Sequence, residues 1–169
     1  RILFGFEKGL CLLPLLLNRS STKKHTVRLK RPPVQLAIRG AMDLWAVKET
    51  FLDQFYCRYG VPVQAGWTVV DIGAGFGDFS ILSAIQNRTG RIMAIEPYPE
   101  SYQLLTENLT HNHIINVEPL PYAIWHSTGR VMLNMSGGEP LQIISQAAHK
   151  QPEGEHLFEV NALTLSDLM

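Results

Sequence analysis

The feature that most constrains this chain is a run of glycines directly after a short apolar segment. Residues 68–72 read Thr-Val-Val-Asp-Ile, a β-branched stretch that predicts a parallel strand covered on both faces. Gly73, Gly75 and Gly77 follow at alternate positions, a spacing that lets the backbone turn sharply and approach a ligand closely. Asp78 stands where it can cap a following helix. The stretch therefore predicts a nucleotide-type pocket, with free N–H groups and a carboxylate at its edge.

The spacing of this run separates two classes of ligand. In the dinucleotide fingerprint G-x-G-x-x-G a diphosphate lies on the helix N-terminus, but here the third position of that pattern is the carboxylate of Asp78. Asp71 precedes the glycines, which suits a ligand with a cationic amino-acid end and no phosphate. Residues 91–96 predict a second buried strand ending on Glu96, 19 residues after Gly77, where βαβ nucleotide folds place the acid that accepts ribose hydroxyls. S-adenosylmethionine is a ligand of this kind, with a cationic amino-acid end, a ribose and no phosphate.

Each of these residues also has a purely structural interpretation. The glycines could form only a tight turn, Asp71 could bond only turn amides, and Glu96 before Pro97 could be a solvated strand end. Their joint occurrence in one βαβ unit favours the cofactor site.

Apolar spacing predicts further elements of an α/β fold. A helix capped by Asp43 should run to about Tyr59 and lie across the mouth of the sheet, where it could act as a lid. Its expected core stripe is Leu44, Val47, Phe51 and Phe55, widened by Leu52, Tyr56 and Tyr59. Residues 34–38 predict a short strand, and Pro99 starts a helix that fades at residues 110–113. Residues 116–120 predict a third parallel strand, and residues 131–135 and 157–163 an appended pair. We expect a Rossmann-like, doubly wound, mostly parallel sheet that is incomplete at its C-terminal end.

The first part of the chain differs in composition from the rest. Residues 1–60 hold eleven Lys and Arg against four Asp and Glu, and residues 61–169 hold four against eleven. We expect residues 1–18 to form an apolar packing helix and the basic run 19–31 to be a solvated linker. Weak membrane-surface contact through residues 1–31 and contact of the basic run with nucleic acid are the alternatives. We therefore divide the chain into residues 1–33 and a domain from 34 to 169.

The cysteines and histidines indicate neither disulfides nor a metal site. Cys11 and Cys57 lie in apolar surroundings and suggest buried free thiols in a reducing cytosol, so we expect a cytoplasmic protein. His111 and His113 have no third ligand at metal spacing and read as a solvated helix end.

Five short motifs, taken in order, resemble FkbM-type S-adenosylmethionine-dependent methyltransferases. They are Asp-Ile-Gly-Ala-Gly-Phe-Gly (71–77), Ile-Glu-Pro (95–97), Glu-Asn-Leu (107–109), Tyr-Ala-Ile (122–124) and Leu-Thr-Leu-Ser-Asp-Leu (163–168). The resemblance covers roughly residues 35–169. It implies a class I enzyme that methylates hydroxyl groups of sugars, lipids or secondary metabolites. The family continues into a strand with a Lys-x-Asp-x-Glu-Gly motif, which this sequence lacks, so the resemblance implies a C-terminally truncated domain.

The same resemblance implies a cofactor site. Asp71, Gly73, Ala74, Gly75, Phe76 and Gly77 would shape the methionine end, Glu96 would hold the ribose, Pro97 and Tyr98 would flank the adenine, and Ala123 and Ile124 would close its far side. The acceptor would be a hydroxyl-bearing small molecule, with no nucleic acid involved.

The catalytic residues are not assigned from the sequence. Asp43, Asp53 and His126 are candidate general bases by their order alone, and each reads as readily as structural or solvated. A nicotinamide-dependent oxidoreductase, a fragment acting as an inactive binding module, and a membrane-surface or nucleic-acid module using the basic run remain the competing hypotheses.

Overall fold

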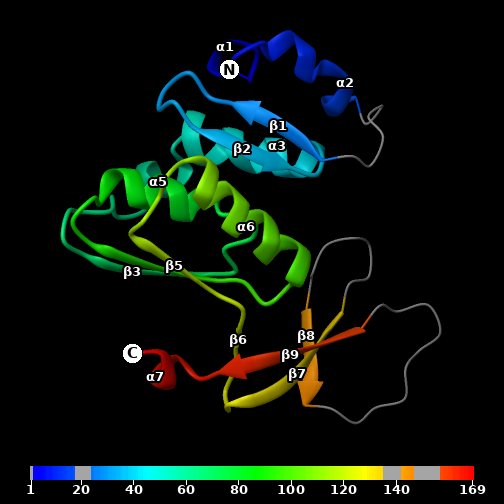
Figure 1. Cartoon of the computed structure of the whole chain (residues 1–169), viewed down its shortest axis with the longest axis vertical. Helices are drawn as coiled ribbons and strands as arrows, with labels where there is room; N and C mark the ends of the chain where they lie inside the picture. Colours follow the sequence, from blue (N-terminus) through cyan, green and yellow to red (C-terminus); the bar gives the residue numbers. More distant parts are fainter. Residues whose placement is uncertain (1, 18–23, 135–141, 147–156) are drawn as a thin grey trace.

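The computed structural model describes residues 2–17, 24–134, 142–146 and 157–169, and its centre is a parallel sheet (Figure 1). Strands β3 (Thr68–Ile72), β4 (Arg91–Ile95) and β5 (Val117–Leu120) lie side by side in that order. Helices α5 (Asp78–Gln86) and α6 (Pro99–His111) connect them and cover the same face (Figure 1). We call these five elements the parallel unit. They form the Rossmann-like α/β fold expected from the sequence.

Burial differs between the strands of this sheet. Central strand β4 has four buried residues, 92–95. Strand β3 was expected to be covered on both faces, but Thr68 and Ile72 are exposed and the residues between them only partly buried. The expectation is wrong because β3 is an edge strand: within the described residues only β4 pairs with it. Ile72 is consequently 56% exposed.

Residues 2–17 and 24–40 form a layer on the outer side of the helices (Figure 1). Instead of one packing helix, residues 2–16 form the short turns α1 (Ile2–Gly5), η1 (Gly9–Leu12) and α2 (Leu13–Leu16), because Gly5, Gly9 and Pro14 interrupt a continuous helix. Strand β1 (His25–Arg28) lies inside the run expected to be a linker and pairs antiparallel with β2 (Gln35–Ile38). Residues 18–23 of that run lie outside the described residues. Cys11 is exposed rather than buried, and Cys57 is partly buried.

Two asparagines of α6 bind the edge of β2. Asn108 accepts a hydrogen bond from the amide of Ala37 (2.6 Å) and donates one to its carbonyl (3.0 Å), while Asn112 does the same with Gln35 (2.9 and 2.7 Å). Four helical residues rise about 6 Å, and two strand residues advance about 6.6 Å. The side chains therefore match alternate peptide groups of β2 and attach this hairpin to the parallel unit.

The long helix expected from Asp43 to Tyr59 is broken. It consists of α3 (Ala41–Val47), the π-helical turn η2 (Lys48–Leu52) and α4 (Phe55–Tyr59). Gln54, with φ +52°, interrupts it before α4. Leu44, Val47 and Phe51 are buried as expected, but Phe55, Tyr56 and Tyr59 are exposed because the chain changes direction at the break. Asp43 lies in the first turn rather than at the cap, which is Gly40.

The C-terminal part forms a second sheet, which we call the antiparallel unit (Figure 1). Its order is β6 (Ala123–Ile124), β9 (Leu157–Leu163), β7 (Gly129–Asn134) and β8 (Gln142–Gln146). Pairing of β7 with β9 confirms the appended pair of strands, and β8 adds a strand not predicted. Thr164 caps the short helix α7 (Leu165–Leu168). Gly137, Gly138, Pro140, Pro152 and Gly154 predict a polar loop between the two strands of this pair, and these five residues lie outside the described residues.

Candidate functional site

The glycine loop, residues 73–77, has the backbone conformation that its sequence requires. Gly73, Gly75 and Gly77 have φ of +78°, +56° and +91°, in the left-handed region that side chains disfavour. A Cβ at Gly77 would lie 2.5 Å from Cδ1 of Leu105, whereas a Cβ at Gly73 or Gly75 would meet nothing within 4 Å. Gly77 thus allows α6 to pack closely, and the other two leave open space above the strand ends.

The backbone amides of this loop are largely used inside the protein. Those of Gly73 and Ala74 donate to the carbonyl of Ile95, and that of Gly77 donates to the carbonyl of Ala74. The amide of Gly75 donates to Oε2 of Glu96 (2.8 Å). The expectation of free N–H groups here is therefore wrong for these four positions. The loop shapes a surface and does not offer these amides to an anion.

Glu96 is fixed at the end of β4. Its side chain is buried, and its oxygens accept hydrogen bonds from the amides of Gly75 and of Tyr98 (2.8 Å). Burial raises the pKa of Glu96, and these two amides and nearby Arg39 oppose the rise. A solvated strand end is thereby excluded. Because a carboxylate has about four lone-pair sites, Glu96 retains acceptor capacity for ligand hydroxyls.

A cavity of about 830 Å³ lies over the glycine loop, within the size range of small-molecule sites. Its wall combines the loop, Glu96 and the start of α6 with the start of α3. We call it the glycine-loop cavity. The lining residues are Arg39, Gly40, Ala41, Met42, Asp43, Ala46, Gly73, Ala74, Gly75, Phe76, Asp78, Glu96 and Ser101. The helix expected to cross the mouth of the sheet thus forms one wall of the cavity through α3.

Arg39 and Asp43 form a bidentate ion pair on the wall of the glycine-loop cavity. Nε and Nη2 of Arg39 donate to the two oxygens of Asp43 (3.0 and 3.1 Å), and Nη1 donates to the hydroxyl of Ser101 (3.0 Å). The Arg39 amide also donates to Asp43 (2.8 Å). Burial lowers the pKa of Arg39, but the hydrogen bonds and the charge of Asp43 raise it by more. The net pKa therefore lies above its usual value and the guanidinium stays charged. The pair connects the end of β2 with α3 and α6.

Two more carboxylates lie beside the loop. Oδ2 of Asp71 accepts from the hydroxyl of Ser80 (2.5 Å), and Oδ2 of Asp78 accepts from Thr50 (2.5 Å). Asp71 therefore bonds a helix hydroxyl. Burial raises the pKa of Asp71, and the charge of Glu96 adds to the rise. Burial also raises the pKa of Asp78 to about 6, with a contribution from Asp71. A carboxyl group with that pKa can accept a proton near neutral pH.

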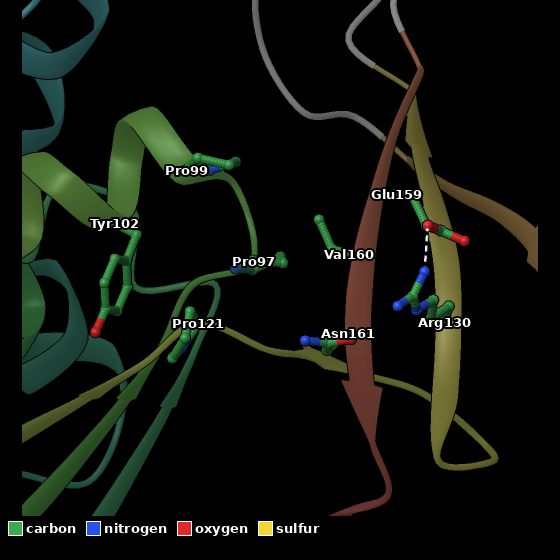
Figure 2. A pocket seen from close by; sticks show the side chains of 8 residues that line it. All are labelled: Pro97, Pro99, Tyr102, Pro121, Arg130, Glu159, Val160 and Asn161. Atoms are coloured by element: carbon green, nitrogen blue, oxygen red, sulfur yellow. Dashed lines mark hydrogen bonds and ion pairs between the residues drawn. The ribbon is translucent and has the colours of Figure 1, made fainter.

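A second cavity, of about 420 Å³, is lined by Pro97 and lies between the parallel and antiparallel units (Figure 2). We call it the proline cavity. Figure 2 shows Pro97 and Pro121, which follow β4 and β5, opposite Val160 and Asn161 of β9. Its remaining lining residues are Pro99, Tyr102, Arg130 and Glu159, of which the last two form an ion pair (2.8 Å). Close by, the rings of Tyr98 and Phe158 meet edge to face at 5.6 Å.

The structure brings together part of the residue set that the sequence predicted. Gly73, Ala74, Gly75, Phe76 and Glu96 line the glycine-loop cavity, and Pro97 lines the proline cavity. Asp71, Gly77, Tyr98, Ala123 and Ile124 are not in the lining of either. Ala123 packs into the core of the antiparallel unit. Sequence reasoning missed Arg39, Ser101 and Asn161, which come from elements distant in the chain and carry no motif of their own.

The candidate bases named from sequence order are also separated. Asp43 lines the glycine-loop cavity but is paired with Arg39. Asp53 pairs with Lys48, and His126 packs against Trp125. Asp78, which the sequence suggests as a helix cap and as a carboxylate that disfavours a diphosphate, lies on the cavity wall.

One protein-family model matches the part of the chain that holds the parallel unit. Residues 57–123 match the TRM5/TYW2 methyltransferase domain. This segment contains the glycine loop and Glu96, together with all three parallel strands. The fold is that of the class I methyltransferases, whose cofactor is S-adenosylmethionine.

Three individual proteins are similar to parts of this chain. The 31-O-demethyl-FK506 methyltransferase FkbM of Streptomyces tacrolimicus is 26% identical over 90 residues, covering 53% of this chain and 35% of that relative. The chain thus spans about a third of the relative's length. Among solved structures, M. jannaschii TYW2 in complex with AdoMet shows 25% identity and a TM-score of 0.48, over 60% of this chain and 44% of that one. The M. jannaschii tRNA m1G37 methyltransferase shows 19% identity and a TM-score of 0.42, over 62% and 31%.

No helix in the described part of the chain is long and apolar enough to cross a membrane.

Proposed function

We propose that this chain is the cofactor-binding part of an S-adenosylmethionine-dependent O-methyltransferase whose acceptor is a hydroxyl group on a sugar, lipid or secondary metabolite. The observation that carries the cofactor assignment is Glu96, buried and fixed by two amides at the edge of the glycine-loop cavity. The acceptor class is supported by the similarity to FkbM and by the order of the five motifs.

The residues present fit this cofactor in charge and shape. Open space lies above Gly73 and Gly75, and Glu96 can accept the two ribose hydroxyls. In this proposal the adenine extends past Pro97 and Tyr98 toward Pro121, with Ala123 and Ile124 on its far side in β6, the strand that pairs with β9. Asp71 and the loop from Gly73 to Gly77 shape the methionine end.

The oxidoreductase alternative fits less well. A dinucleotide needs loop amides for its pyrophosphate, and the amides of Gly73, Ala74, Gly75 and Gly77 donate within the protein. Asp78 would also repel a diphosphate.

When bound, S-adenosylmethionine supplies a methyl group on a positively charged sulfur. The chain's contribution is to position the reactants in line and to exclude water, which can account for much of the rate. Asp78 is our candidate proton acceptor, because it lies on the cavity wall with a pKa of about 6. Thr50 fixes its orientation.

The test is methyl transfer from tritiated S-adenosylmethionine to separate pools of sugar, lipid-alcohol and polyketide-alcohol acceptors, with total RNA as a fourth arm. We expect label in one hydroxyl pool, a large reduction with Glu96→Gln, and no reduction with Glu118→Gln, which changes an exposed carboxylate outside both cavities. Label in RNA alone would contradict the hydroxyl acceptor and favour the substrate of the tRNA methyltransferase named above.

A further inference from the structure

We propose that the Arg39–Asp43 pair binds the amino-acid end of S-adenosylmethionine, with Arg39 receiving its carboxylate and Asp43 its ammonium group. The inference rests on the proposed function and deepens it, because it names the residues that hold the charged end of the cofactor.

The charges on the cavity wall leave a ligand carboxylate with one cationic partner. The charged lining residues in the described part of the chain are Arg39, Asp43, Asp78 and Glu96. Three of these four groups would repel an anion, and most of the glycine-loop amides already donate within the protein. A carboxylate in this cavity is therefore favoured beside the guanidinium of Arg39.

Arg39 has donors for this contact. A guanidinium carries five N–H groups, and three of them donate to Asp43 and Ser101. Among the described residues this leaves one N–H on each terminal nitrogen. Two terminal N–H groups suit the two oxygens of a carboxylate.

Asp43 complements the other charge of an amino acid. Oδ2 accepts from the amide and Nε of Arg39, whereas Oδ1 accepts only from Nη2 in the bonds described. Oδ1 therefore has a lone pair for an ammonium group. A pair of opposite charges, itself close to neutral, matches a zwitterion better than it matches a ligand with a single charge.

The position of the pair agrees with this role. Arg39 contacts Ser101 in the first turn of α6, five residues after Glu96, and its charge acts on the Glu96 carboxyl. A ligand whose ribose lies on Glu96 can thus place a short charged substituent on the pair. Asn108 supports this geometry, because it bonds Ala37 two residues before Arg39 and the carbonyl of Phe76 in the glycine loop.

Two ligands that differ only in the amino-acid end test the inference. S-adenosylhomocysteine carries the zwitterion, and 5′-methylthioadenosine lacks it but keeps the adenosine and the sulfur. Both are titrated calorimetrically into the wild-type chain, Arg39→Gln, Arg39→Lys and the control Arg91→Gln, which breaks an exposed ion pair outside both cavities.

We expect Arg39→Gln to lower the affinity for S-adenosylhomocysteine roughly 10- to 100-fold, which is the loss expected for a charge-assisted pair. The affinity for 5′-methylthioadenosine should stay within about twofold of the wild-type value. The affinity of Arg39→Lys for S-adenosylhomocysteine should lie between those of the wild type and Arg39→Gln, because lysine keeps the positive charge but not the planar guanidinium with its paired N–H donors. Equal weakening of both ligands would mean a purely structural role and would overturn the inference, as would no weakening of either. If the wild-type chain binds neither ligand, the proposed function fails as well.

Discussion

The parallel and antiparallel units of this chain rest on cores of very different size. Among the side chains that the structure describes, the first belongs to a cluster of 22 buried apolar residues that includes the N-terminal layer, whereas the second has five: Ala123, Val131, Leu133, Val160 and Ala162. The glycine loop and Glu96 lie on the larger core, and β9 contributes only the far wall of the proline cavity. The glycine loop and Glu96 therefore rest on the larger of the two described cores.

The largest expected difference between the units comes from one type of truncation made in each. Leu105→Ala removes a fully buried side chain of α6, and we expect it to cost about 3–5 kcal/mol of unfolding free energy. Leu133→Ala, in β7, should cost about 2–3 kcal/mol because fewer neighbours lose contacts. Urea unfolding of both variants measures this, and a larger loss for Leu133→Ala would contradict the comparison.

The next effect concerns the connection of the hairpin to the parallel unit. Asn108→Ala leaves three buried backbone groups, at Ala37 and Phe76, without this partner, and should cost roughly 3 kcal/mol. Asn112→Ala, one turn later and only partly buried, should cost roughly 1–2 kcal/mol. Equal losses in the same unfolding assay would show that Asn108 has no special part in ordering the glycine loop.

A smaller effect separates backbone strain from close packing. Gly77→Ala places a Cβ in a left-handed conformation and against Leu105, for an expected cost of about 2–3 kcal/mol. Gly66→Ala has a similar φ of +83° but open space, so it should cost about 1 kcal/mol. The difference between their thermal midpoints isolates the contact with α6, and its absence would mean that α6 does not depend on Gly77.

The smallest effect is a pH dependence located in the parallel unit. Asp78 has an ordinary pKa of 3.8 that burial raises to about 6 in the fold, so the folded state binds the proton more tightly than the unfolded state. Its contribution to stability is therefore greatest below about pH 4 and is lost as the pH rises to about 6. Thr50, Asp71 and Tyr56 face this group.

We expect the loss to amount to roughly 1–2 kcal/mol, since the side chain is only partly buried. Asp78→Asn should be more stable than the wild type at pH 8 and no more stable at pH 4. Parallel unfolding curves at the two pH values would contradict the raised pKa.

The sequence predicted most of the parallel unit because its signals are local. Each signal determines structure within a few residues. The signals are the glycine spacing, the apolar run that ends at Glu96, and the proline at position 99 that starts α6. The helix break at Gln54 was missed because the apolar spacing continues across it, and β1 was missed because its basic residues obscure the alternation around Val27.

The site was predicted only in part because half of it depends on tertiary contacts. The glycine loop and Glu96 could be read from one βαβ unit. Arg39 reaches the cavity only because Asn108 and Asn112 attach β2 to α6, and the Glu-Asn-Leu motif gave the residue without its role. The paired charges therefore became visible only in the folded chain.

The central claim is that the glycine-loop cavity binds an adenosyl amino acid and not a dinucleotide. The most direct test is calorimetric titration of the chain with S-adenosylhomocysteine and, separately, with NADH, repeated with Glu96→Gln. The account predicts saturable binding of S-adenosylhomocysteine alone, weakened at least about tenfold by Glu96→Gln because the ribose loses a charged acceptor. Binding of NADH alone, or S-adenosylhomocysteine binding that is indifferent to Glu96, would contradict it.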